Sequence, residues 1–279
     1  MRANIVPLRA MTAGETLDSA VALLRQRALP LLSLALLLAA GEQALLFGLR
    51  AYAGMEPPYY YWPPRLTDPS WWTVVALGFA VEAFVIALLA AYAGAAAGPA
   101  LLGRDTGHRA LWRRARPLPA LPLAVLAGVV CGTAALAGLV FWPLAYGMTA
   151  LATAILTVDR PANPLVAVAR AAGRAARGGM RGLGVLLLGY FTWLVVRMAL
   201  GSGWISVADL FSGLPGSGWV GWAVPVAWAL ANTVAYAALA CLNAVVLVEI
   251  RVRTEGLDIL VNRARSRGAD PEQALVVTR

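Results

Sequence analysis

The sequence predicts an all-α, polytopic membrane protein with six transmembrane helices and cytoplasmic amphipathic helices. The 279 residues are 60% hydrophobic and only 13% charged, with a mean hydropathy of +0.71, whereas a soluble domain carries about a quarter charged residues. The charges are grouped in short arginine-rich stretches between apolar runs of about 20 residues, the length that crosses a bilayer. This pattern argues against a soluble enzyme, a disulfide-rich secreted domain, a coiled coil and a disordered chain.

Residues 1–27 are predicted to form a cytoplasmic amphipathic segment. Thr12 and Glu15 have the spacing of a capping box, in which side chains satisfy the first amide groups of a helix. Apolar residues then recur at helical spacing, at Leu17, Val21, Leu24 and Ala28. We expect a helix in the membrane interface that bends into the first span at Pro30. That span should stay uncleaved, because its apolar run is longer than the core of a signal peptide.

Six apolar segments make up the predicted membrane domain, residues 28–250. They are 28–49, 72–98, 118–138, 142–158, 183–204 and 220–249. The third and fourth depend on length: one helix over 118–158 would measure about 62 Å, twice the hydrocarbon core of about 30 Å. We therefore expect this run to fold back on itself at residues 138–143.

The distribution of arginines predicts the orientation. All 23 basic residues are arginine, and 20 of them fall on inner segments if both termini are cytoplasmic. The outer loops then keep only Arg50 and Arg65, and Arg197 lies within the fifth span. By the positive-inside rule, we expect a multi-pass protein of the cell (inner) membrane with both termini cytoplasmic. Residues 251–279 are then a cytoplasmic helical extension and tail.

Three ionisable residues, Glu42, Glu82 and Arg197, lie inside apolar spans. A charge near the bilayer centre is unfavourable by at least about 2.5–3.5 kcal/mol, so these residues should face protein or water and find partners. Residue counts place Glu42 and Arg197 at similar depth, which makes them the preferred pair, with Glu82 second. Asn232 and Asn243 are the available neutral partners. A structural ion pair is the favoured interpretation, and a proton or substrate path is the alternative.

A second cluster of charges follows Asn163 and Pro164, a good cap and first residue for a helix. Four arginines on one face form what we call the basic stripe: Arg170, Arg174, Arg177 and Arg181. The stripe predicts a surface helix held by anionic lipid head groups, and docking of an acidic partner is the alternative. Nucleic-acid binding is not expected, since membrane orientation accounts for the excess of arginine.

Several further patterns indicate packing or anchoring. The glycine pairs at 94–98 and 128–132 match the spacing that lets membrane helices approach closely, within the bundle or at a dimer face. Cys131 and Cys241 are expected to be small packing residues without a disulfide. The proline- and tyrosine-rich residues 57–64 should anchor at the membrane interface, with stacking on a sugar or peptide ligand as the alternative.

The sequence gives no support for catalysis. It has no phosphate-binding GxxxxGK[ST] motif and no HExxH motif, and its one histidine is His108. Glu255 and Asp258 have arginine neighbours, so helix salt bridges explain them. We therefore expect no enzyme activity, no metal site and no cofactor.

Three stretches resemble a family of uncharacterised actinobacterial six-span integral membrane proteins: residues 13–25, 164–181 and 251–259. That family is similar to the membrane domain joined to some glycerophosphodiester phosphodiesterases. The resemblance implies an assembly partner, since such proteins are encoded near transglutaminase-like membrane proteins and AAA-type ATPases. The phosphodiesterase activity is not carried over, because its catalytic domain is absent from the sequence. We therefore expect a non-enzymatic scaffold or accessory subunit of a membrane complex, with a small-solute transporter or permease subunit as the alternative.

Overall fold

The computed structural model describes residues 6–55, 68–177, 179–205, 207 and 219–276, and within these ranges the ordered elements are all helical. The first half of the chain contains α1 (Ala13–Gln26), α2 (Ala28–Tyr52), α3 (Pro69–Leu101), α4 (His108–Ala115), α5 (Pro117–Ala137), α6 (Trp142–Thr149) and α7 (Ala152–Val158). The second half contains α8 (Pro164–Arg177), α9 (Gly179–Met198), the π-helical turn η1 (Ala199–Gly203), α11 (Val220–Glu255), α12 (Leu257–Ser266) and η2 (Gln273–Leu275).

Five helical segments in the described residues are long and apolar enough to cross a membrane. They are Ala28–Tyr52, Pro69–Leu101, Pro117–Ala137, Arg181–Gly203 and Gly221–Glu255. These segments correspond to five of the six predicted spans. In the residues that the structure describes, the chain therefore has the all-helical composition of a multi-pass membrane protein, by the length and apolar character of its helices.

The remaining predicted span, 142–158, is not one long helix of this kind. It is divided into α6 and α7 at Ala150 and Leu151, and its 17 residues would extend only about 26 Å. The Thr149 hydroxyl at the break donates to the Ala145 carbonyl at 2.9 Å, a back-bond that bends helices. The preceding turn is where the sequence predicts it, and it includes Gly138 with a φ of +142°, a conformation that favours glycine.

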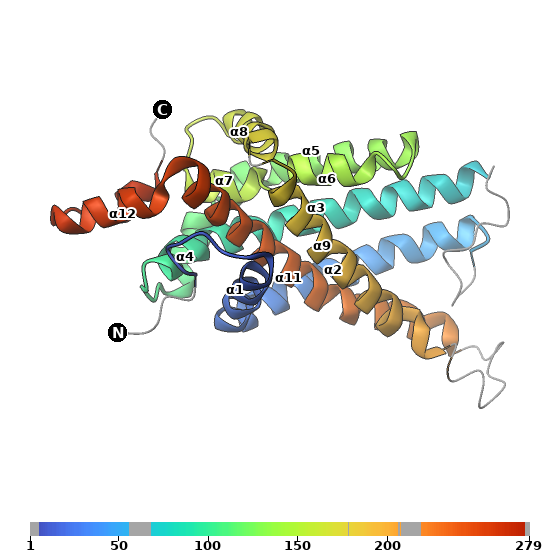
Figure 1. Ribbon diagram of the computed structural model, residues 1–279. Helices are drawn as coiled ribbons and strands as arrows, with labels where there is room; N and C mark the ends of the chain where they lie inside the picture. Colours follow the sequence, from blue (N-terminus) through green and yellow to red (C-terminus); the bar gives the residue numbers. More distant parts are fainter. Residues whose placement is uncertain (1–5, 56–67, 178, 206, 208–218, 277–279) are drawn as a thin grey trace.

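The helices run back and forth between two ends of an elongated bundle (Figure 1). We call the end that carries α4, α8 and α12 the arginine-rich end, and the opposite end, where α2 finishes and α3 begins, the distal end. Helix α11 passes through the centre: 94% of its most apolar stretch is buried, against 33% for α2 and 28% for α9. Apolar side chains on the outer faces of α2, α5 and α9, such as Leu37, Val129 and Val195, are exposed, as expected for surfaces that contact lipid.

The capping box at the start of α1 is confirmed. The Glu15 backbone N–H donates to the Thr12 hydroxyl at 3.2 Å, and the Thr12 backbone N–H donates to the Glu15 carboxylate at 2.8 Å. Arg9 also donates to that carboxylate, at 2.5 Å. The hydrogen bond from Arg9, followed by the one from the Thr12 backbone, lowers the pKa of Glu15 to about 2.

Both glycine pairs lie in contacts within the bundle. A Cβ atom on Gly128 would come within 2.7 Å of the Ala80 carbonyl oxygen on α3, and a Cβ on Gly94 would collide with Thr157 on α7. The glycines thus permit the close approach of α3 to α5 and α7. Cys131 and Cys241 are buried free thiols, in agreement with their predicted role in packing.

Candidate functional site

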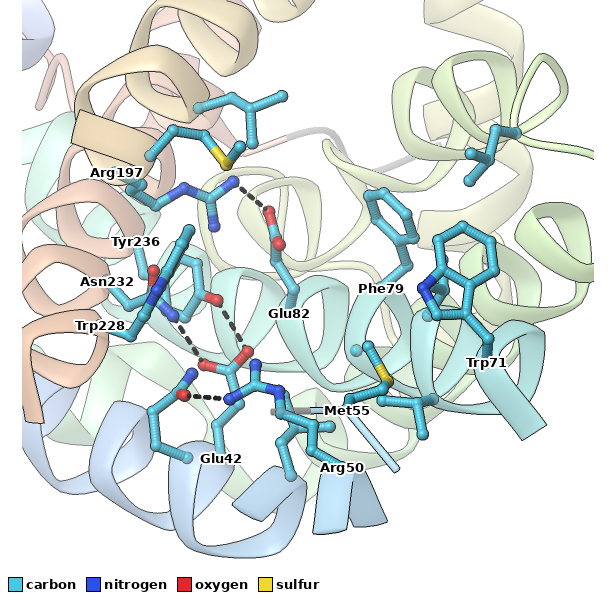
Figure 2. A pocket seen from close by; sticks show the side chains of 18 of the residues that line it. Glu42, Arg50, Met55, Trp71, Phe79, Glu82, Arg197, Trp228, Asn232 and Tyr236 are labelled. Atoms are coloured by element: carbon cyan, nitrogen blue, oxygen red, sulfur yellow. Dashed lines mark hydrogen bonds and ion pairs between the residues drawn. The ribbon is translucent and has the colours of Figure 1, made fainter. Parts of the chain in front are cut away.

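Glu42 lies within α2, and its carboxylate is turned toward α11 (Figure 2). The residue is 4% exposed. The Asn232 amide donates to one carboxylate oxygen at 3.2 Å, and the Tyr236 hydroxyl donates to the other at 2.8 Å. Asn232 and Tyr236 share a face of α11 because they are one helical turn apart. Asn232 is thus a neutral partner of an intramembrane acid, as predicted, whereas Tyr236 is not among the predicted residues.

Arg197 pairs with Glu82 and not with Glu42. Its guanidinium donates to Glu82 Oε1 at 2.9 Å and to the Tyr190 hydroxyl at 3.1 Å. The Cζ atom of this guanidinium also lies 5.3 Å from the ring centroids of both Tyr190 and Tyr236, within the range of cation–π attraction. The residue is 2% exposed, so these contacts replace the water that the charge has lost.

The predicted preference for a Glu42–Arg197 pair is therefore wrong. Counting residues from the end of a helix gives only the depth of a side chain in the membrane. Which neighbouring helix the side chain contacts depends on the direction in which its face of the helix points. Glu42 faces α11, while Glu82 on α3 faces α9. Asn243, the other predicted neutral partner, is engaged elsewhere and accepts from the Tyr146 hydroxyl at 3.4 Å.

A cavity of about 360 Å³ is lined by the three predicted residues Glu42, Glu82 and Arg197, and also by Arg50. Its walls come from α2, α3, α9 and α11, and it extends from Met55 and Trp71 at the distal end inward to Glu82 and Arg197. In Figure 2 the acids, Arg197 and Asn232 lie on one side of this space, and Trp71 and Phe79 lie on the other. Such a volume is at the lower end of the range of small-molecule sites, which are mostly apolar with a few convergent polar groups.

Polar atoms on these walls have unused hydrogen-bonding capacity. Arg197 Nε, Asn232 Oδ1 and Trp71 Nε1 are buried, and none has a hydrogen-bond partner among the described residues. Asn232 and Arg197 are each 2% exposed. Because buried polar groups are normally satisfied, these atoms mark the cavity as a place where a polar ligand can be held. No group of three or more His, Cys, Asp or Glu that could hold a metal ion occurs in the part of the chain that the structure describes.

The basic stripe has a different environment from the predicted one. Arg174 has a 7% exposed side chain and donates to Asp159 at 2.6 Å and to Glu255 at 2.8 Å. Arg170 lies 3.6 Å from Asp159, and Arg181 donates to the Met11 carbonyl at 3.0 Å. The side chain of Arg177 lies outside the described residues.

The prediction that the stripe faces lipid is therefore wrong for Arg170 and Arg174. These arginines face inward because they form ion pairs with acids there. Asp159 at the end of α7 pairs with both, and Glu255 at the end of α11 pairs with Arg174. Asp159 is fully buried and also accepts from Arg251 at 3.1 Å. The expected helix salt bridge of Glu255 is present as well, with Arg251 at 2.9 Å. We call Asp159, Arg174, Arg251 and Glu255 the buried ion network.

The chain after α12 folds back onto the arginine-rich end. Glu272 forms ion pairs with three arginines from separate segments, Arg104, Arg114 and Arg160, at 3.5, 2.7 and 3.1 Å. The hydrogen bond from the Glu272 backbone N–H, together with Arg104, lowers the pKa of Asp270. Leu275 is buried, and its carbonyl accepts from Arg251 at 2.8 Å. The sequence predicts none of these contacts, since the partners are far apart along the chain.

Residues 57–64, for which interfacial anchoring is predicted, lie outside the described residues. Trp71, which follows these residues in the chain, is buried at the start of α3, and its ring packs edge-on against Trp72 with centroids 4.9 Å apart. Trp71 therefore belongs to the cavity wall. No family model, curated protein or solved structure matches this chain, so its function has to be argued from the site itself.

Proposed function

We propose that the protein is a six-span protein of the inner membrane that binds a small solute within its helix bundle, as a transporter or permease subunit and not as an enzyme. The observation that carries this proposal is the cavity of about 360 Å³, which places two acids and two arginines beside apolar and aromatic walls. A protein that acts only as a scaffold needs no such space, and its buried charges would be paired in a filled core.

The path of the chain supports six crossings. Helix α5 finishes at the distal end, and α6 and α7 return beside it toward the arginine-rich end (Figure 1). An interrupted helix can cross a membrane where its freed backbone groups are buried in protein, and the residues of α7 are all buried. An even number of crossings places both termini on one side, and the positive-inside rule makes that side cytoplasmic.

This topology predicts a clear labelling pattern. In a background with Cys131→Ala and Cys241→Ala, a thiol at Tyr52→Cys should react with a membrane-impermeant maleimide in intact cells. Tyr52 is 88% exposed at the distal end of α2. A thiol at Ser266→Cys, exposed at the end of α12, should react only after permeabilisation. Reaction at position 266 but not at 52 in intact cells would show the opposite orientation.

The proposed function is tested by measuring whether a water-soluble reagent reaches the cavity from each side of the membrane. Gly78 lines the cavity, and a Cβ atom there has open space around it. In the same cysteine-free background, Gly78→Cys should react with a charged, impermeant methanethiosulfonate reagent from the distal side and, more slowly, from the other side in inverted vesicles. Gly41→Cys is the matched control, because Gly41 is exposed in the middle of α2 and outside the cavity, also with open space, and should react from neither side.

The outcomes separate the alternatives. Reaction of Gly78→Cys from both sides supports transport, because alternating access requires it. Reaction from the distal side alone would limit the protein to solute binding. Protection from both sides would contradict the proposal and favour the second candidate, a scaffold or accessory subunit.

One observation favours that second candidate. The buried ion network joins α7, α8 and α11. Glu272 forms further ion pairs with Arg104 and Arg114, which connect two more segments to this end. A rigid arginine-rich end of this kind would suit attachment to another membrane protein or to anionic head groups, which Arg181 could contact through its half-exposed side chain. The resemblance of residues 251–259 to the actinobacterial family agrees with an assembly partner.

A further inference from the structure

Two acids and two arginines line the cavity, and the two acids have different partners. Glu82 has Arg197 as its ion-pair partner, whereas both hydrogen bonds that Glu42 accepts come from the neutral groups of Asn232 and Tyr236. Arg50, the other basic residue on the wall, starts two helical turns nearer the distal end, and its guanidinium reaches back to donate to Gln43 at 2.9 Å (Figure 2). Since an ionised carboxylate in a buried site is stabilised by a nearby cation, the Glu42 end of the cavity favours a positively charged ligand.

The hydrogen-bonding groups at this end are acceptors. Each Glu42 oxygen already accepts one hydrogen bond and keeps a further lone pair, and Asn232 Oδ1 has no donor among the described residues. An ammonium group supplies several N–H donors with one positive charge. It would therefore satisfy both acceptors at once, which a neutral alcohol with a single O–H cannot do.

The remaining walls suit the rest of such a molecule. Trp228 and Tyr236 line the cavity beside Asn232, and Trp71 and Phe79 face them across the space (Figure 2). Aromatic faces attract organic cations and bury their carbon atoms. A volume of about 360 Å³ is consistent with a compact molecule that has one aromatic or aliphatic body.

We propose that the cavity binds a small organic cation, a protonated primary or secondary amine with an apolar body, and that Glu42 is its counter-ion. This inference rests on the proposed function, since it names the class of solute for the same cavity. It adds a requirement that solute binding alone does not make, namely a preference for positive charge that depends on one residue.

Three probes of nearly equal size and shape test the preference: 2-phenylethylammonium, 2-phenylethanol and 3-phenylpropionate. Binding to the purified full chain in lipid nanodiscs would be measured by isothermal titration calorimetry at constant salt. We expect the ammonium to bind about tenfold more tightly than the alcohol, the difference between a charge-assisted and a neutral hydrogen bond. The carboxylate should bind most weakly.

Two variants assign the preference to Glu42. Glu42→Gln should reduce the affinity for the ammonium to that for the alcohol, while the affinity for the alcohol stays unchanged. Asp18→Asn is the matched control, because Asp18 is exposed on α1 and outside the cavity, and it should keep the full preference. The comparison of probes in the unmodified chain decides the charge preference even if Glu42→Gln does not fold.

Each other result has a defined meaning. Equal or tighter binding of the alcohol or the carboxylate would overturn the cation inference and leave solute binding intact. A preference for the ammonium that survives in folded Glu42→Gln would overturn the role of Glu42. Absence of binding by all three probes would count against the cavity as a binding site, and therefore against the proposed function as well.

Discussion

Replacing Arg197 with leucine should lower the free energy of unfolding by about 3–5 kcal/mol, because Glu82 would remain buried without its cation. Adding Glu82→Leu to Arg197→Leu should recover a large part of that loss, since the double variant buries no unpaired charge at this pair. Both residues are less than one-tenth exposed, so the compensation available in the single variant is limited to water that enters the cavity they line. The measurement is a double-mutant cycle of unfolding in mixed detergent micelles.

The matched control uses the other acid. Glu42→Leu added to Arg197→Leu should recover little, because Glu42 bonds to Asn232 and Tyr236 on α11. If Glu42→Leu restores stability and Glu82→Leu does not, then the pairing in the structure is incorrect. Strictly additive losses with Glu82→Leu would show that Arg197 and Glu82 do not interact energetically.

Asp159→Asn should have an effect of similar size, about 3–5 kcal/mol. The fully buried Asp159 carboxylate neutralises Arg174 at 2.6 Å and Arg251 at 3.1 Å, and both arginines are themselves buried. The asparagine keeps the shape of the side chain but removes the negative charge, so the loss reports on electrostatics and not on packing. Thermal unfolding in detergent measures it directly.

A control for this variant is again Asp18→Asn, which removes an exposed acid and should change stability by no more than about 1 kcal/mol. Arg174→Met offers a second check from the opposite side of the pair. Restoration of stability when Arg174→Met is added to Asp159→Asn would support the buried ion network. A loss for Asp159→Asn as small as that for Asp18→Asn would contradict it.

Local patterns in the sequence predict much of the fold. The capping box at Thr12, the turn at Gly138 and the start of α8 after Asn163 are all present where the sequence places them. Each depends on residues only a few positions apart, whose geometry is determined by backbone sterics and hydrogen bonding. The apolar spans are equally local, because helix length and hydropathy are properties of a single segment.

The partners of buried charges could not be predicted in this way. The pairing of Arg197 with Glu82, and of Arg174 with Asp159 and Glu255, depends on how helices rotate and tilt against one another. A stripe of arginines at helical spacing is equally compatible with lipid outside and with acids inside. One signal was available: Asp159 directly follows an apolar run and precedes Arg160, so an acid stands at the boundary where arginines gather.

The central position of α11 has a consequence for biosynthesis. Because chains are made from the N-terminus, α2, α3, α5 and α9 enter the membrane before the helix that fills the space between them. Until α11 arrives, Glu42 lacks both Asn232 and Tyr236. The close contacts of α3 with α5 and α7 can form before then, whereas the contacts of α2 and α9 with α11 cannot. A ribosome that stalls before residue 220 would therefore leave the buried acid of α2 without its hydrogen-bond donors.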